Sequence, residues 1–252
     1  MRVISLVPSL TETLIECGIN VVGRTQFCIH PADRIAHIPS VGGTKAVNWR
    51  RCAVLKPDLV VFDREENTLA MKDACPYDWI ATHITSVGSV GNELEKLAQR
   101  IGNATLSGQA KAWSRLASSA PAPFQGWDNT PGLIAPLSAL SVESAPAKLE
   151  YIIWRKPWTG IGPDTFIHSM LRACGFGEYL PDHAKPYPEL SADIMAQPDT
   201  FYLFSSEPYD FLKEKDWLEA QGFRGAIVDG EFYSWFGARS FRHLSQLLGN
   251  ID

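Results

Sequence analysis

Residues 2–18 read Arg2-Val-Ile-Ser-Leu-Val-Pro-Ser-Leu-Thr-Glu-Thr-Leu-Ile-Glu-Cys-Gly18, and the rest of the chain is organised around them. The first part is short, aliphatic and ends at a proline, which predicts a buried strand. Ser9-Leu-Thr-Glu12 matches a capping box, in which the Ser9 and Glu12 side chains bond each other's backbone amides. It predicts a helix that Gly18 ends in the left-handed conformation.

A strand that enters a helix through a tight turn leaves backbone amides at the carboxyl edge of a sheet. Open α/β proteins bind ligands at that edge, where helix N-termini also favour anions. We therefore expect Pro8, Ser9 and Leu10 to form one wall of a ligand site.

Composition bounds the class of protein. The chain has 252 residues, of which 45% are hydrophobic and 20% are charged, so it is globular and long enough for one large domain or two lobes. The net charge of -5 argues against a nucleic-acid binder, which needs a basic face. No apolar run reaches the roughly 20 residues that span a bilayer.

The cellular location is expected to be the cytoplasm, because the first strand begins directly after Met1 with no basic and apolar signal segment before it. A shortened chain would instead belong to the periplasm. The five cysteines are odd in number and have no CxxC spacing, so they do not form a disulfide framework. They favour a reducing compartment.

Strand and helix patterns alternate along most of the chain, which predicts an α/β fold with mostly parallel sheets. Residues 1–88 form an N-terminal β/α lobe, with strands expected at 21–25, 56–62 and 79–83. Residues 89–147 form a helical connector and linker, with helices at 89–101 and 109–117. Residues 148–252 form a C-terminal β/α lobe, with strands at 149–154, 200–204 and 226–228 and helices at 164–174, 190–196 and 241–248.

Several stretches, in this order and spacing, resemble the class III periplasmic binding-protein fold. They are Arg2–Glu12, Val22-Gly23, Lys56-Pro-Asp-Leu-Val-Val61, Gly162-Pro-Asp-Thr-Phe166 and Tyr187-Pro188. This superfamily, which is also called chelatase-like, includes receptors for vitamin B12, haem and ferric siderophores. The resemblance implies two lobes joined by a helical backbone, with a ligand cleft between them.

The resemblance also implies which side chains face the ligand. Ser9, Phe27 and Thr44 would do so from the first lobe, and Trp158, Tyr187 and Ser234 from the second. Trp235 and Arg239 lie in or beside the same final loop. Thr44 stands where the vitamin B12 receptor has a tryptophan, which predicts a more polar first-lobe wall.

Importer-linked relatives carry an acidic side chain on each lobe that docks on arginines of an ABC permease. The first position is Arg50 here and the second is Asp193. An arginine facing an arginine pocket is repulsive, which argues against delivery to an importer. The chain is more similar still to a branch known as helical-backbone metal receptors, through stretches such as Gly42-Gly-Thr-Lys45 and Ser205-Ser-Glu-Pro-Tyr209.

The polar and aromatic residues that follow predicted strands should converge at one site, since parallel strands share a carboxyl edge. A set of rings and fixed charges suits a planar or amphipathic anion, because arginine binds carboxylates in a forked geometry. The ligand-binding set that we predict is Ser9, Leu10, Arg24, Phe27, Thr44, Lys45, Glu66, Trp154, Arg155, Trp158, Tyr187, Glu207, Ser234, Trp235 and Arg239.

Three functions follow as hypotheses. The first is a non-catalytic, monomeric receptor for a corrin, haem or ferric siderophore, with no covalently bound cofactor. The second is a cytosolic enzyme or cofactor-handling protein that uses the same cleft, although no nucleophile triad, GxSxG elbow or P-loop occurs. The third is a bare metal site at Cys28 and His30, whose alternative is a buried thiol and a hydrogen-bonded imidazole. Arg155 has an alternative role, either solvated or in an ion pair with Glu65 or Glu66. Trp158 and Trp235 have alternative positions in the core.

Overall fold

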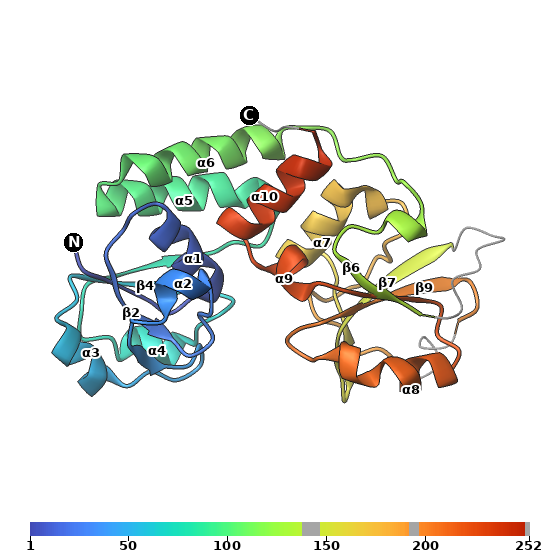
Figure 1. Cartoon of the computed structure of the whole chain (residues 1–252), viewed down its shortest axis with the longest axis horizontal. Coiled ribbons are helices and arrows are strands. Elements are labelled where there is room, and N and C mark those ends of the chain that lie inside the picture. Colours follow the sequence, from blue (N-terminus) through green and yellow to red (C-terminus); the bar gives the residue numbers. More distant parts are fainter. Residues whose placement is uncertain (138–146, 192–196, 250–252) are drawn as a thin grey trace. The chain divides into compact units, whose positions relative to one another are not determined.

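The computed structural model describes residues 1–137, 147–191 and 197–249. The chain forms two compact units, each with its own sheet. The first unit contains Met1–Ser119 together with Trp235–Arg242, and the second contains Ala120–Ser234 with His243–Asp252. The first unit therefore includes a short segment from near the end of the chain (Figure 1).

The sheet of the first unit has five parallel strands in the order β3-β2-β1-β4-β5. β1 lies at its centre and β1 and β4 are wholly buried, as the aliphatic patterns predict. The strands are β1 (Val3–Ser5), β2 (Val21–Thr25), β3 (Ser40–Gly42), β4 (Leu59–Asp63) and β5 (Trp79–Thr82). The parallel arrangement confirms the fold class expected from the alternating pattern.

Short helices connect these strands: α1 (Pro8–Glu16), α2 (Ala32–Ile35), α3 (Trp49–Leu55) and α4 (Leu69–Asp73). The predicted capping box of α1 is wrong. The helix begins at Pro8, which suits the first helical position because its missing N–H needs no partner there. Val7 is the N-cap, and its carbonyl accepts from the amide of Thr11 at 2.8 Å. Gly18 ends the helix with φ 73°, as expected.

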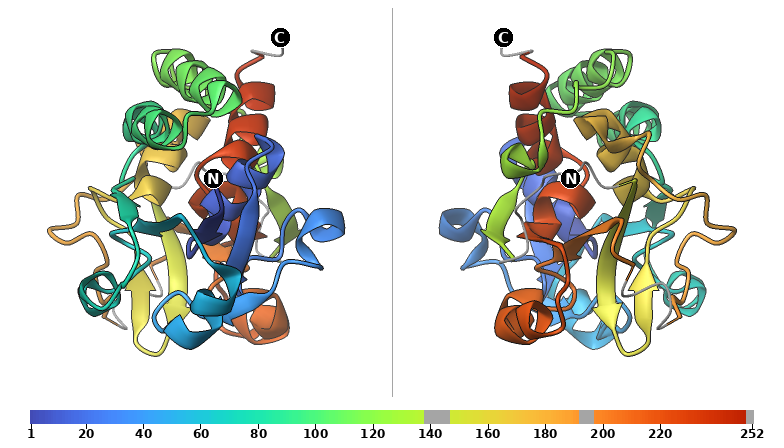
Figure 2. Two further views of the ribbon diagram at one scale, coloured as in Figure 1. Left: turned by 90° about the vertical axis from the view of Figure 1, so that its left-hand side faces the viewer. Right: turned by 90° about the vertical axis from the view of Figure 1, so that its right-hand side faces the viewer.

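Two longer helices, α5 (Val87–Ile101) and α6 (Ala104–Ala117), run side by side (Figures 1 and 2, in green). They approach closely at Gly91, where a Cβ atom would lie 2.2 Å from Ser114 Oγ and 2.9 Å from the carbonyl oxygen of Ala110. α6 starts five residues before its predicted start at 109, because the Asn103 side chain caps it by accepting from the amide of Leu106 at 2.8 Å.

The sheet of the second unit has the strand order β6-β10-β9-β7-β8. The three central strands are parallel, and both edge strands are antiparallel to their neighbours. The strands are β6 (Leu133–Pro136), β7 (Lys148–Arg155), β8 (Trp158–Gly160), β9 (Thr200–Ser205) and β10 (Gly225–Val228). The edge strand β8 was not expected from the sequence, and it folds back on β7 as a hairpin with Thr159 opposite Trp154.

The helical elements associated with the second sheet are α7 (Phe166–Leu171), a π-turn (Arg172–Phe176), a 3-10 turn (Phe211–Glu214), α8 (Lys215–Ala220) and α9 (Gly230–Ser234). The closing helix is α10 (Ala238–Leu247), which starts three residues before its predicted start at 241 and contributes residues to both units. The predicted helix at 190–196 falls largely outside the described residues. Within the described ranges, no helix is both long and apolar enough to cross a membrane.

Candidate ligand-binding site

Loops at the carboxyl edge of the first sheet are joined by the Asn67 side chain. Its Nδ2 donates to the carbonyl oxygens of Leu6 at 3.2 Å and Thr44 at 2.8 Å, and its Oδ1 accepts from the amide of Asp63 at 2.9 Å. These three residues follow or end β1, β3 and β4. The structure thus brings together, within the first unit, loops that the sequence places at one sheet edge.

The acidic side chains at this edge are partly desolvated. Asp63 is fully buried and accepts from Thr82 Oγ1 at 2.6 Å and from the amide of Glu65 at 2.9 Å. Burial still raises the pKa of Asp63, and it also raises the pKa of Glu66, which the charge of Lys45 partly lowers. Lys45 Nζ donates to the carbonyl of Glu65 at 3.1 Å. Lys45 and Glu66, both predicted ligand residues, therefore lie together.

Phe27 is an exposed aromatic side chain at the same edge. It is 51% exposed, and its Cε2 atom lies 3.3 Å from the position that a Cβ on Gly43 would occupy. The bare backbone of the glycine turn thus supports one edge of the ring, next to Thr44. A half-exposed phenylalanine held in this way offers apolar area to a ligand.

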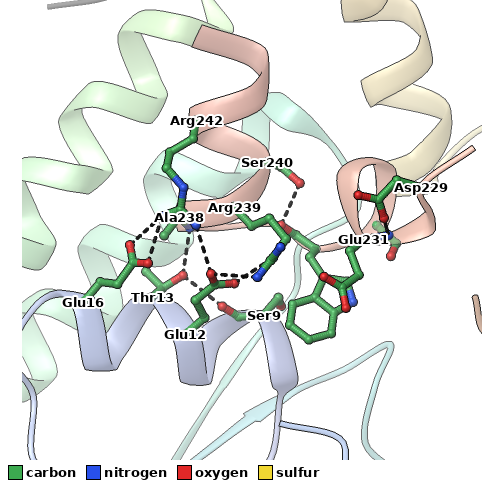
Figure 3. Close-up of polar contacts among 12 residues, drawn as sticks. Ser9, Glu12, Thr13, Glu16, Asp229, Glu231, Ala238, Arg239, Ser240 and Arg242 are labelled. Atoms are coloured by element: carbon green, nitrogen blue, oxygen red, sulfur yellow. Dashed lines mark hydrogen bonds and ion pairs between the residues drawn. The ribbon is translucent and has the colours of Figure 1, made fainter. Parts of the chain in front are cut away.

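The segment Trp235–Arg242 is tied to α1 by charged groups (Figure 3). Glu12 is 2% exposed and its carboxylate accepts from Arg239 Nε at 3.0 Å and Nη2 at 3.1 Å. Arg242 Nη2 donates to the same carboxylate at 2.9 Å, and Arg242 Nη1 donates to Glu16 at 2.8 Å. Two arginines thus neutralise the buried Glu12 carboxylate. A buried charge needs such close partners, because its removal from water costs free energy.

Backbone contacts fix the same segment. The Thr13 hydroxyl accepts from the amide of Ala238 at 2.9 Å and donates to the carbonyl of Ser9 at 2.9 Å (Figure 3). Gly237 has φ 103°, and a Cβ there would lie 2.2 Å from Thr13 Oγ1. Trp113 Nε1 donates to the carbonyl of Gly237 at 3.1 Å. Ser9 is buried at this junction and Leu10 is fully buried in the core, so the Leu10 side chain offers no surface to a ligand.

This anchoring brings three predicted site residues together. The rings of His30 and Trp235 meet edge to face with centroids 5.3 Å apart, and the Arg239 guanidinium carbon lies 5.5 Å from the Trp235 ring centroid. That distance is within the range of a cation–π contact. Glu12 fixes Arg239 by a forked ion pair, so the cation is held against the ring. Trp235 itself is 8% exposed and lies in the core.

Two other predicted residues serve the first unit itself. The Cys28 thiol is fully buried, with Thr11 Oγ1 and Thr25 Oγ1 both 3.1 Å from its sulfur, and burial raises its pKa. The Arg24 guanidinium donates to the carbonyls of Ile38 and Thr25, both at 3.0 Å. Among the described residues, no group of three or more His, Cys, Asp and Glu side chains could hold a metal ion.

In the second unit, the loops after β9 and β10 meet at Gly230. The Gly230 amide donates to Ser206 Oγ at 3.0 Å, and a Cβ on Gly230 would lie 2.5 Å from Glu207 Cγ. Ser234 Oγ donates to Glu207 Oε1 at 3.3 Å. The predicted residues Glu207 and Ser234 are therefore in direct contact. Tyr187, which the sequence also predicts, is 46% exposed.

The aromatic and basic residues of β7 and β8 are engaged within the second unit. Arg155 pairs with Glu214 and lies 3.7 Å from the Trp217 ring centroid. Trp158 stacks on Phe211 with centroids 6.1 Å apart and planes at 5°. Arg155 therefore has an ion pair, but its partner is Glu214 rather than Glu65 or Glu66. Trp158 is half-buried and packs against the core of the second unit. Ligand contact by either residue stays a prediction.

The remaining β7 residue, Trp154, is 41% exposed and meets Tyr209 edge to face at 5.4 Å. Asp193 lies outside the described residues, and Arg50 is exposed on α3. Glu12 was not predicted from the sequence as a partner of the C-terminal segment. The spacing of Glu12 with Glu16 and of Arg239 with Arg242, one helical turn in each case, was a signal that could have found it.

No protein-family model matches the sequence, and no curated protein matches it either. Solved structures match almost the whole chain. A periplasmic haem-binding protein from Pseudomonas aeruginosa is 16% identical, covers 99% of this chain and 91% of its own, and has a TM-score of 0.71. The fold is that of a periplasmic binding protein. The likeness at this level of identity is one of fold.

Two further structures share this binding-protein fold. The vitamin B12-binding protein BtuF of Vibrio cholerae is 16% identical, with 98% of this chain and 95% of that chain covered and a TM-score of 0.66. An ABC transporter substrate-binding protein from Listeria monocytogenes is 12% identical, with 98% and 96% covered and a TM-score of 0.67. The class III fold expected from the sequence is thereby confirmed.

Proposed function

We propose that the protein is a non-catalytic receptor for a metal-containing macrocycle or chelate, such as a corrin, haem or a ferric siderophore. The observation that carries the proposal is the set of Phe27, His30, Trp235 and Arg239 in the first unit, on a fold that haem- and vitamin B12-binding proteins share. The Phe27 ring, which is 51% exposed, supplies apolar area for a flat ligand. The Trp235 ring is 8% exposed and supports His30 and Arg239 from the interior, and the Arg239 guanidinium attracts the ligand's carboxylates.

The partial burial of the groups at the first sheet edge supports a binding role. The Asp63 carboxylate accepts hydrogen bonds from the Thr82 hydroxyl and from the amide of Glu65. These bonds give it a structural role in the loop after β4 rather than the role of a general base. Arg239 and Glu12 are paired. A site whose charges are fixed in pairs suits recognition of a preformed ligand better than proton transfer, which needs a group poised to gain and lose a proton.

The test is a titration of purified protein with haemin, cobalamin and a ferric siderophore. We expect one of them to quench tryptophan emission in a saturable manner and to raise the melting temperature, because a ligand that binds the native state alone stabilises it. Native mass spectrometry of freshly purified protein identifies any ligand that co-purifies. If none of the three ligands changes either quantity and none co-purifies, the ligand class is wrong.

The partner we propose is an ABC permease that presents carboxylates to α3. Arg50 is exposed there, so a permease surface rich in arginine would be repelled and an acidic one attracted. The measurement is co-purification with the permease encoded nearest to this protein, compared between the wild type and Arg50→Glu. The cytoplasmic location expected from the sequence stays a prediction, which fractionation of the native cells tests.

A further inference from the structure

The second unit contains a hollow of about 450 Å³ that lies apart from the loops after β9 and β10. Its volume falls within the range of small-molecule sites. Eight residues line it, all from the second unit: Pro121, Ala122, Phe124, Arg172, Gly175, Gly177, Glu178 and Tyr179. None of the predicted ligand residues is among them.

Backbone packing shapes this hollow. Gly175 has φ 94°, and a Cβ there would lie 2.6 Å from the carbonyl oxygen of Ala122 and 3.0 Å from the amide of Phe124. Loop 121–124 therefore passes directly over the π-turn. The amide of Ala122 donates to the carbonyl of Ala173 at 2.8 Å. These backbone contacts fix the floor of the hollow. The close approach at Gly175 leaves no room for a side chain there.

Aromatic rings supply two of its walls. Phe124 and Tyr179 have centroids 5.1 Å apart, and each also contacts the ring of Trp127, at 4.9 and 5.6 Å. Trp127 is 4% exposed, and its Nε1–H is buried without a hydrogen-bond partner in the described part of the chain. Native proteins satisfy almost all such groups. The unsatisfied N–H therefore lies in the ring cluster that forms these walls.

Opposite charges also line the hollow. Arg172 and Glu178 are both exposed, and neither makes an ion pair with another residue in the described ranges. The guanidinium of Arg172 lies near Gly177, since a Cβ on Gly177 would be 3.9 Å from Arg172 Cζ. A carboxylate is the group that a guanidinium binds best, and an ammonium is the complement of a glutamate.

We propose that this hollow is a second binding site, for a small zwitterion with an aromatic or apolar side chain, such as a free amino acid. Arg172 binds its carboxylate, Glu178 binds its ammonium, and Phe124 and Tyr179 contact its side chain. The site is separate from the proposed receptor function, so either can fail without the other.

The experiment compares three probes that share a phenethyl skeleton and differ in their charged groups: L-phenylalanine, 3-phenylpropanoate, which lacks the ammonium, and phenethylamine, which lacks the carboxylate. Binding is followed by the ¹H–¹⁵N signals of the tryptophan indoles, with the Trp127 signal assigned by Trp127→Phe. We expect L-phenylalanine to shift the Trp127 signal in a saturable way, with a dissociation constant on the order of 1 mM for a ligand of this size. The other two probes should bind at least about threefold more weakly, since each lacks one charged contact.

Three variants test the residues. Arg172→Gln and Glu178→Gln should each weaken phenylalanine binding about threefold to tenfold. Gly177→Leu should abolish it by filling the hollow, since Gly177 has φ -54° and its Cβ would meet only Arg172 atoms, none closer than 3.9 Å. The matched control is Gly108→Leu, at a position on α6 with nothing within 4 Å of a Cβ, and it should bind like the wild type.

The proposal is overturned if L-phenylalanine leaves the Trp127 signal unchanged, or if Gly177→Leu binds it as well as the wild type does. Equal binding of all three probes overturns the assignment of Arg172 and Glu178. A shift of the same size in the Gly108→Leu control and the wild type, together with a loss in Gly177→Leu, supports the site.

Discussion

Glu12 and Arg239 form a forked ion pair, with Nε to Oε2 at 3.0 Å and Nη2 to Oε1 at 3.1 Å, across 227 positions of sequence. The pair attaches the last part of the chain to the first helix. It also fixes the arginine beside Trp235. Glu12, which the sequence predicts as part of a helix cap, thus anchors Arg239, which the sequence predicts as a binding residue.

Replacing Glu12 by Gln should lower the free energy of unfolding by about 2–4 kcal/mol, because Arg239 would lose the partner that compensates its partial burial. Glu16→Gln is the matched control. Its pair with Arg242 is more exposed, at 27% and 46%, so its loss should cost about 1 kcal/mol or less. Urea denaturation measures both. Equal losses in the two variants would show that burial does not set the cost.

Glycine substitutions on the paired helices should have opposite effects. Gly91→Ala should destabilise the protein by about 1–3 kcal/mol, since the new methyl group would meet Ser114 and the backbone of Ala110. Gly108→Ala should instead stabilise it by about 0.5–1 kcal/mol, because the position is open and alanine favours a helix. The comparison requires the denaturation midpoint of each variant. A stable Gly91→Ala protein would contradict the close helix contact.

Stability should fall as the pH drops below about 6.5, in part because of His168. Burial, and secondarily the charge of Arg172, lowers the pKa of His168 in the folded protein. The unfolded chain therefore binds the proton first as the pH falls, which favours unfolding. His168→Gln should make the loss of stability between pH 7.5 and 5.5 smaller, and Arg172→Gln should do so in part. An unchanged slope in His168→Gln is the result that contradicts this assignment.

Thiol labelling should distinguish one cysteine from the other four. Cys75 is half-buried, whereas Cys17, Cys28, Cys52 and Cys174 are buried. Burial raises the pKa of each thiol, which slows its reaction. We expect one fast equivalent with a maleimide in the native protein, and five in denaturant. Cys75→Ser should remove the fast phase, and a fast phase that remains would mean that a buried thiol opens to solvent.

Phe27→Ala should weaken binding of the ligand identified by titration by at least about tenfold, with little change in stability, because the ring is exposed and its loss leaves no cavity. Ile29→Ala is the matched control, since Ile29 is exposed to the same extent, 51%. Equilibrium titration gives both affinities and thermal melts give both stabilities. Equal weakening in the two variants would place the ligand elsewhere.

Local patterns were enough to predict most strands of both sheets. The run Val21–Thr25 and the aliphatic residues before Asp63 became β2 and β4. The start of α1 was predicted wrongly because two helix-start signals overlap there. Ser9 and Glu12 have the spacing of a capping box. Pro8 is a better first helical residue, however, so α1 begins at Pro8, before the predicted cap at Ser9.

The candidate site was harder to predict, because its members are chosen by partners distant in sequence. Nothing near Arg155 reveals that Glu214 binds it, or that Trp217 covers its guanidinium. Trp158 was predicted to face the ligand, and only the structure shows that its ring also stacks on Phe211. By contrast, Trp235 and His30 were both predicted, and only the structure shows that their rings touch.

The membership of Trp235–Arg242 in the first unit determines how the protein can be divided in the laboratory. A recombinant fragment that stops at Ser119 lacks both arginines that neutralise Glu12, so it should express as an unstable chain. Adding a synthetic peptide of residues 235–242, or fusing that sequence after Ser119 through a flexible linker, should restore it. The segment 235–242 would then serve as a complementation tag for the first 119 residues.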